Sequence, residues 1–192
     1  DLLDLAALKQ QPSKRERPFA SGRLSPRTGM LLAPLLLTIA FGLATSALPG
    51  AFVTVLGAYY VLTLAYSLRL KRYLMVDVIA LALLYTLRIV AGAAALGIPL
   101  SFWILAFSMF MFLSLALVKR YSELHRTQAM QTGLDFGRGY LPADLGMIAS
   151  LGGSAGFMAV LVLALYINDL NDGTAYRHPQ LIWLACPLLL YW

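Results

Sequence analysis

The sequence predicts an all-α membrane protein, a polytopic bundle of helices that crosses the bilayer several times. Three observations lead to this fold class. The chain of 192 residues is 60% hydrophobic and only 12% charged, and this charged share is about half of what an ordinary soluble domain carries. Apolar runs near the roughly 20 residues that a spanning helix needs recur along the chain. The connections between them alternate between uncharged and strongly basic.

Five apolar runs are long enough to span a membrane, and the end of the sequence interrupts a sixth. They cover residues 29–48, 51–66, 76–96, 102–118, 146–167 and 181–192. Residues 1–7 have helical composition and are expected to finish a further span. We therefore expect residues 1–192 to form one transmembrane domain that continues past both ends of the sequence. The start lacks the pattern of a signal peptide.

The positive residues predict the orientation of the bundle. Connections 46–50 and 97–101 carry no charge, whereas connections 9–27, 69–72 and 119–138 hold thirteen of the fifteen Lys and Arg residues. The positive-inside rule places these three basic connections on the cytoplasmic side. The same cations can meet anionic lipid headgroups, so the net charge of +6 does not call for a nucleic-acid partner.

The stretch over residues 1–22 combines acidic and basic side chains. Asp1 and Asp4 are three residues apart and share one helix face, and carboxylates at a membrane edge can hold Mg2+ against a phosphorylated substrate. Lys14 and Arg17 follow, and they suit phosphate oxygens as a point charge and as a planar fork. The alternative from spacing alone is a solvated helix end before a basic loop that sets topology.

Arg88 lies near the middle of the run 76–96, where a charge is costly enough to indicate a function or a specific partner. Asp77 shares nearly the same helix face but lies about 16 Å away along the axis, so these two side chains cannot pair directly. A water-lined cavity that opens to the cytoplasm would hold both. The alternative for Arg88 is a buried structural pairing with an unidentified group on another helix.

Three further features are expected to be structural. Residues 167–173 contain two acids, but their Asn, Asp and Gly content favours a turn on the opposite side of the membrane. His125 and His178 have no Cys or His at ligand spacing, which argues against zinc. Cys186 lies in an apolar run and is expected to pack there.

Several motifs resemble those of the UbiA superfamily of intramembrane prenyltransferases. The Asp-x-x-Asp of Asp1 and Asp4, with the Pro-Ser-Lys-Arg-Glu-Arg-Pro-Phe-Ala-Ser-Gly of residues 12–22, resembles the first aspartate-rich motif and its loop. Residues 66–72 look like the family's Tyr-Ser/Thr-x-x-Lys-Arg element, and residues 77–92 continue the pattern. Residues 119–124, Lys-Arg-Tyr-Ser-Glu-Leu, are similar to the branch with decaprenyl-phosphate phosphoribosyltransferase and relatives fused to a phosphatase-like domain.

The resemblance implies a UbiA-like helix bundle whose cavity opens to the cytoplasmic face and to lipid. It implies magnesium (Mg2+) as the cofactor, with a polyprenyl lipid and a diphosphate donor as partners. Together with Arg88 it indicates a candidate site with three parts. These are the metal ligands Asp1 and Asp4, the catalytic candidates Tyr66, Lys71, Arg72 and Glu123, and the substrate-binding candidates Lys14, Arg17, Arg88, Lys119, Arg120 and Tyr121. For Glu123 the alternative is a surface pair with Lys119, one helical turn away.

The opening motif departs from the family pattern, Asn-Asp-x-x-Asp-x-x-x-Asp followed by Arg and His. Leu8 stands at the third Asp, Lys9 at the Arg and Gln11 at the His. Losing one carboxylate weakens a Mg2+ site that already relies on few protein ligands. Three hypotheses follow: polyprenyl transfer to an acceptor first, phosphoribose transfer from phosphoribosyl diphosphate to a polyprenyl phosphate second, and a non-catalytic scaffold or transporter-like relative third.

Overall fold

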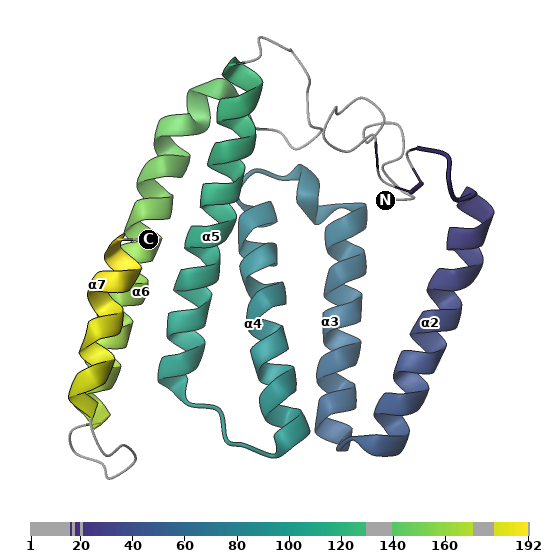
Figure 1. Cartoon of the computed structure of the whole chain (residues 1–192), viewed down its shortest axis with the longest axis horizontal. Coiled ribbons are helices and arrows are strands. Elements are labelled where there is room, and N and C mark those ends of the chain that lie inside the picture. The colour runs from purple at the N-terminus through teal and green to yellow at the C-terminus, as the bar shows by residue number, and fades with distance from the viewer. Residues whose placement is uncertain (1–15, 17, 20, 130–139, 171–178, 192) are drawn as a thin grey trace. The chain divides into compact units, whose positions relative to one another are not determined.

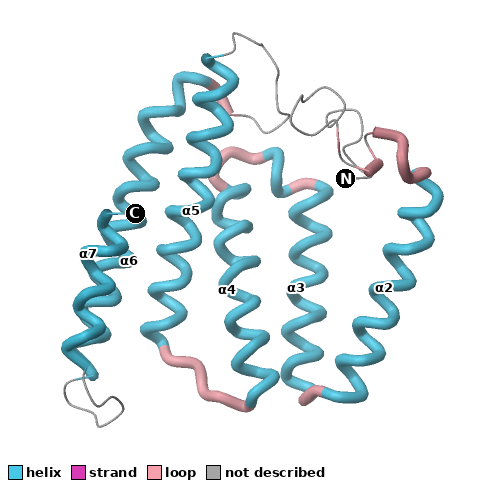
Figure 2. Tube along the Cα trace, in the orientation of Figure 1, coloured by secondary structure: helices cyan, strands magenta, loops and turns pink. Residues whose placement is uncertain are grey.

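The structure is a computed structural model that describes residues 16, 18–19, 21–129, 140–170 and 179–191 (Figures 1 and 2). In this part of the chain it contains helices and no strand, which confirms the all-α fold class. Internal contacts divide the chain into two compact units, Asp1–Gly57 and Ala58–Trp192. The expectation of one transmembrane domain stays a prediction.

Among the described residues, five helices are long and apolar enough to cross a membrane. They are α2 (Pro26–Ala47), α3 (Gly50–Leu68), α4 (Val76–Leu96), α5 (Phe102–Ala129) and α6 (Leu145–Leu170). Each contains one of the five predicted spans or extends to within a residue or two of it. The chain is thus an integral membrane protein. The interrupted sixth run corresponds to the 3-10 helix η5 (Pro179–Leu184) and α7 (Ala185–Tyr191), where Cys186 is buried as expected.

Local sequence signals explain where α2 begins, and the helix contains an internal proline. The Ser25 side chain caps the helix by accepting a hydrogen bond from the Thr28 backbone N–H at 3.3 Å, and Pro26 in the first turn lacks only a donor that would be unpaired anyway. Pro34 lies inside the helix. Pro34 has no N–H to donate to the Met30 carbonyl one turn earlier. The Thr38 hydroxyl donates to the Pro34 carbonyl at 3.1 Å.

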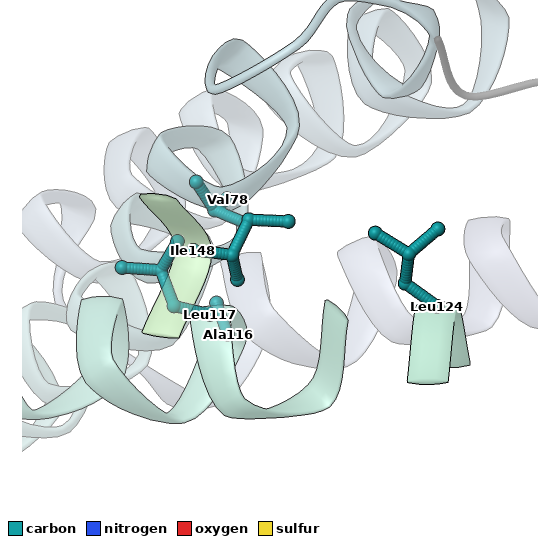
Figure 3. Close-up of a cluster of buried hydrophobic side chains, with 5 residues drawn as sticks. All are labelled: Val78, Ala116, Leu117, Leu124 and Ile148. Atoms are coloured by element: carbon teal, nitrogen blue, oxygen red, sulfur yellow. The ribbon is translucent and has the colours of Figure 1, made fainter. Parts of the chain in front are cut away.

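The core of the second unit lies where α4, α5 and α6 meet. Val78 of α4, Ala116, Leu117 and Leu124 of α5, and Ile148 of α6 form a buried cluster. Figure 3 shows the side chains of Val78, Ala116, Leu117 and Ile148 gathered together, with Leu124 further along α5. This cluster packs together α4, α5 and α6, and two of these helices, α4 and α5, also carry polar residues described below.

Small residues let α5 and α6 approach closely, as they do between many membrane helices. An added Cβ at Gly152 would lie 3.3 Å from the Leu117 Cβ, and one at Gly156 would lie 3.2 Å from the Ser114 hydroxyl oxygen. The Ser114 hydroxyl donates to the Gly152 carbonyl at 2.8 Å. The backbones therefore meet without room for larger side chains.

Helix α5 is longer than the sequence predicted, and this corrects the interpretation of residues 119–138 as a connection. The helix continues through Ala129, so Lys119 to Glu123 lie on helical backbone. Hydropathy falls after Val118, but Lys, Arg, Glu, Leu and Gln are all good helix formers. The apolar run thus marked the end of the lipid-like segment, not the end of the helix.

Helix α6 also continues further than expected, through Leu170. The turn predicted over residues 167–173 therefore does not begin at Ile167. Residues 171–173 lie outside the described part of the chain.

Candidate functional site

Four polar side chains, here called the polar cluster, join three helices at one end of the second unit. Tyr66 comes from α3, Asp77 from α4, and Arg120 and Glu123 from α5. Asp77 is 0% exposed and Arg120 is 3% exposed. A charge so deeply buried is costly unless another charge and hydrogen bonds compensate it.

The polar cluster supplies that compensation around the Arg120 guanidinium. Its Nε and Nη2 donate to the two carboxylate oxygens of Asp77, with Nη2 to Oδ1 at 3.0 Å. The Tyr66 hydroxyl donates to Asp77 Oδ1 at 2.8 Å and accepts from Arg120 Nη2 at 3.3 Å. Arg120 Nη1 donates to Glu123 Oε2. Planar two-point pairs of this kind are the strong form of a charged hydrogen bond.

Local structure explains why these residues meet. Tyr66 lies near the end of α3 and Asp77 in the first turn of α4, where a carboxylate suits the helix dipole. Only a short connection with the 3-10 helix η3 (Leu70–Arg72) separates the two helices. Arg120 and Glu123 are three residues apart on α5 and share one face. The continuation of α5 past Val118 is therefore what completes the polar cluster.

A second contact stabilises the turn into α4. Met75 has a left-handed backbone with φ of 64°, which is unusual for a residue with a side chain. Its backbone N–H donates to the Tyr140 hydroxyl at 3.3 Å. Tyr140 also packs against the core cluster, so a residue far along the sequence holds this turn in place.

Arg88 contacts a side chain on another helix, but it is exposed in the structure, whereas the alternative from the sequence was a buried pairing. Its Nη2 and Nε donate to the Tyr59 hydroxyl of α3 at 2.9 and 3.3 Å. The guanidinium carbon also lies 5.6 Å from the centre of the Tyr59 ring and 5.1 Å from that of Tyr85. Cation–π contacts of this length are favourable. The expected water-lined cavity stays a prediction.

The remaining candidates of the second unit surround the polar cluster. Lys71 and Arg72 lie in η3, directly before α4. Lys119 and Tyr121 are exposed on α5, and the Tyr121 ring stacks on His125 at 5.8 Å. In Figure 1 the α3–α4 connection and the C-terminal part of α5 lie toward the same end of the unit.

Arg69, which follows α3, keeps its positive charge over a wide pH range. Its Nε donates to the Tyr73 hydroxyl at 3.3 Å, and this hydrogen bond raises the pKa of the Arg69 guanidinium above its ordinary value. Arg69 therefore adds a permanent positive charge beside Lys71 and Arg72.

The Arg120 side chain already has partners within the bundle. The sequence grouped it with Lys119 and Tyr121 as a substrate-binding residue, but each of its three guanidinium nitrogens already donates within the polar cluster. Glu123 is bonded to Arg120, whereas the sequence offered Lys119 as its structural partner. Hydropathy and helical spacing along one chain do not show which side chains of separate helices meet.

The predicted metal ligands Asp1 and Asp4, and the phosphate candidates Lys14 and Arg17, lie outside the described residues. Among the residues that the structure describes, no group of three or more His, Cys, Asp or Glu side chains is arranged to hold a metal ion. Asp77 is already paired with Arg120. The assignment of Mg2+ to Asp1 and Asp4 stays a prediction.

Some residues in these contacts were not predicted. Tyr59 and Tyr85 lie in apolar runs, and nothing in the sequence marked them as partners of Arg88. An Arg inside a span did imply that some partner exists. Asp169, which the sequence assigned to a turn, accepts a hydrogen bond from the Trp103 indole Nε1 at 2.9 Å. This bond links the start of α5 to the end of α6.

Comparison with known proteins identifies the family. The model of the UbiA prenyltransferase family matches residues 1–192. The chain belongs to the UbiA prenyltransferase family. Members of this family are prenyltransferases that generally use Mg2+ at diphosphate-binding motifs, and they form helical membrane bundles, in agreement with the described helices.

Relatives within the UbiA family refine this placement. The chain is 38% identical over 186 residues to the uncharacterized protein y4nM of Sinorhizobium fredii, 35% over 197 residues to nodulation protein NoeC of Azorhizobium caulinodans, and 32% over 184 residues to decaprenyl-phosphate phosphoribosyltransferase of Corynebacterium glutamicum. These alignments cover 96%, 100% and 93% of this chain, but only 36%, 62% and 54% of the relatives. The chain thus spans about a third to just under two thirds of the lengths of these relatives.

Proposed function

We propose that this UbiA-family protein is a membrane transferase that displaces diphosphate from an activated donor and uses a polyprenyl lipid as the second substrate. One observation carries the proposal: a chain that the family model matches throughout gathers Tyr66, Lys71, Arg72 and Glu123 at one end of its helix bundle. Basic groups beside a carboxylate at a membrane edge suit a phosphorylated donor.

Each group at this end has a chemical task in the proposed reaction. Lys71 and Arg72 bind the diphosphate and stabilise its negative charge as it leaves. Lys119 and Tyr121, both exposed, lie on the same helix as Glu123 and contact the donor. Mg2+, when held by Asp1 and Asp4, neutralises part of the diphosphate charge. Glu123 acts as a base or as a further acidic group of the site.

The relatives favour one donor over the other. Three homologues besides the Corynebacterium protein carry the name decaprenyl-phosphate phosphoribosyltransferase, each 34% identical to this chain. We therefore place transfer of phosphoribose from phosphoribosyl diphosphate to a polyprenyl phosphate first, as the Lys-Arg-Tyr-Ser-Glu-Leu element of residues 119–124 also favours. The sequence-based order had polyprenyl transfer first, because it is the commonest chemistry of the superfamily. Polyprenyl transfer to an acceptor is the second candidate, because it is the chemistry after which the matching family is named.

The orientation belongs to the same proposal. Residues 69–72 and the basic end of α5 lie at one end of their unit, and the positive-inside rule places such an end in the cytoplasm. A water-soluble donor such as phosphoribosyl diphosphate then reaches the site from the cytoplasm, while the lipid enters from the bilayer.

The test uses the full-length protein in membranes or detergent with Mg2+. One reaction contains radiolabelled phosphoribosyl diphosphate and decaprenyl phosphate, and a second contains a radiolabelled polyprenyl diphosphate with candidate acceptors. Labelled lipid in the first reaction supports the first candidate. Product only in the second reaction would replace it by polyprenyl transfer.

The non-catalytic hypothesis has its own experiment, because Leu8 and Gln11 replace an acid and a His of the family pattern. A full-length Leu8→Asp/Gln11→His variant is assayed beside the parent. Turnover by the parent excludes the scaffold hypothesis. Turnover by the variant alone would show that this chain kept the bundle and lost the chemistry.

A further inference from the structure

We propose that Arg120 is a positioning residue that Asp77 anchors and that orients the Glu123 carboxylate, and that it does not itself bind substrate. This inference rests on the proposed function, in which Glu123 faces the reacting groups. It follows from how the one guanidinium divides its hydrogen bonds between the inside of the bundle and its edge.

The two sides of the guanidinium face different surroundings. Nε and Nη2 point to Asp77, which is 0% exposed, and Nη2 also reaches the Tyr66 hydroxyl. Nη1 points to Glu123, whose side chain is 29% exposed. Arg120 itself is 3% exposed. It therefore connects a fully buried acid to one that reaches the surface of its unit.

The burial of Asp77 fixes the orientation of the Arg120 guanidinium. A buried carboxylate loses its compensation if the guanidinium turns away, so the planar pair holds Arg120 in one orientation. The position of Nη1 is thereby set before any ligand arrives. A Glu at a helix surface otherwise samples several rotamers, and its bond to Nη1 selects among them.

The polar cluster also relates Glu123 to the basic connection. Tyr66 lies on α3, five residues before Lys71, and its hydroxyl bonds to both members of the buried pair. Asp77 lies at the start of α4, directly after η3. The same hydrogen bonds that orient Glu123 therefore anchor both helices that flank Lys71 and Arg72. Preorganised groups of this kind act on the charge that develops during reaction.

The inference predicts that a change at Asp77, which bonds to Arg120, acts on catalysis through Glu123. Full-length wild type, Asp77→Asn, Glu123→Gln and the double variant are compared by kcat, KM and thermal unfolding in detergent. We expect Asp77→Asn to lower kcat of the folded protein about tenfold, with KM for the donor within about twofold. The double variant should then turn over about as fast as Glu123→Gln alone, because neighbours in one network are not additive.

The matched control is Asp169→Asn, which makes the same chemical change at a hydrogen-bonded carboxylate at the other end of α5 and α6. Its kcat should equal that of wild type. A purely structural role for Arg120 predicts instead that Asp77→Asn lowers the unfolding midpoint and leaves kcat of the folded fraction unchanged. That result overturns the inference. So does a double variant whose fold-loss in kcat equals the product of the fold-losses in Asp77→Asn and Glu123→Gln.

The unfolding data separate this inference from the proposed function. If Arg120 joins the two acids, Asp77→Asn and Glu123→Gln are coupled in thermal unfolding, and the coupling disappears in an Arg120→Gln background. Absence of that coupling overturns the inference whether or not the protein turns over. Coupling without turnover of either donor by wild type overturns the proposed function, and with it the positioning role, while Arg120 remains the structural link.

Discussion

Arg120 of α5 and Asp77 of α4 form a two-point ion pair inside the membrane-spanning bundle, with both side chains almost completely buried. The pair joins helices that are 43 residues apart in sequence at these positions. Tyr66 adds α3 to the same contact. A charged pair in this location is expensive to break and specifies which helix faces meet, so it shapes both the stability and the proposed site.

Removing one member of the pair should destabilise the protein strongly. Arg120→Met leaves the Asp77 charge buried with only Tyr66 to compensate it, and we expect a loss of about 3–5 kcal/mol in the free energy of unfolding. Thermal unfolding in detergent measures the change. The control is Asp77→Leu/Arg120→Met, which removes both charges and should be less destabilised than Arg120→Met. A double variant that is less stable than the single one contradicts the prediction.

The close approach of α5 and α6 predicts opposite outcomes for two adjacent glycines. Gly152→Ala places a Cβ against the buried Leu117 at 3.3 Å, and overpacking of this kind costs about 1–3 kcal/mol. At Gly153 nothing lies within 4 Å of an added Cβ, so Gly153→Ala should be neutral or stabilise the helix by up to about 1 kcal/mol. Both variants are compared with wild type by thermal unfolding, and equal effects at the two positions would contradict the described packing.

The Arg88 contacts predict that two tyrosines differ in importance. Tyr59→Phe removes the hydroxyl that accepts two hydrogen bonds from Arg88 and should cost about 1 kcal/mol of stability. Tyr85→Phe keeps the ring near the guanidinium and serves as the matched control, with an expected change within about 0.5 kcal/mol. Thermal unfolding of both variants tests this difference. A loss for Tyr85→Phe as large as that for Tyr59→Phe would contradict the assignment of the Tyr59 hydroxyl as the specific partner of Arg88.

The proposed donor site predicts a change in KM at η3. If Lys71 binds the diphosphate, Lys71→Gln should raise KM for the donor about tenfold, since hydrogen bonds between charged groups contribute about 1.5–3 kcal/mol. The control is Arg126→Gln, which removes an equal charge from an exposed position in the last turn of α5. The two KM values are measured with the donor that turns over in the assay above. Equal increases in both variants would indicate general electrostatic attraction and no specific contact by Lys71.

The sequence by itself determined the all-α fold class, the positions of the five spans and the family. These depend on hydropathy along one chain and on short motifs, which are local properties. It also singled out Arg88 as a costly charge in an apolar run and placed Asp77 on nearly the same helix face. The assignments of Asp1, Asp4, Lys14 and Arg17 depend on the sequence alone and stay predictions.

Only the tertiary structure decided the partners of these charges: Tyr59 for Arg88, and Arg120 with Tyr66 for Asp77. It also showed that α5 continues beyond its apolar part and carries Glu123 to Arg120. Helical spacing predicts which residues share a face of one helix. It does not predict how two helices are rotated and shifted relative to each other. That rotation and shift are set by packing, here by the close approach of α5 and α6 at Gly152 and by the cost of leaving Asp77 unpaired.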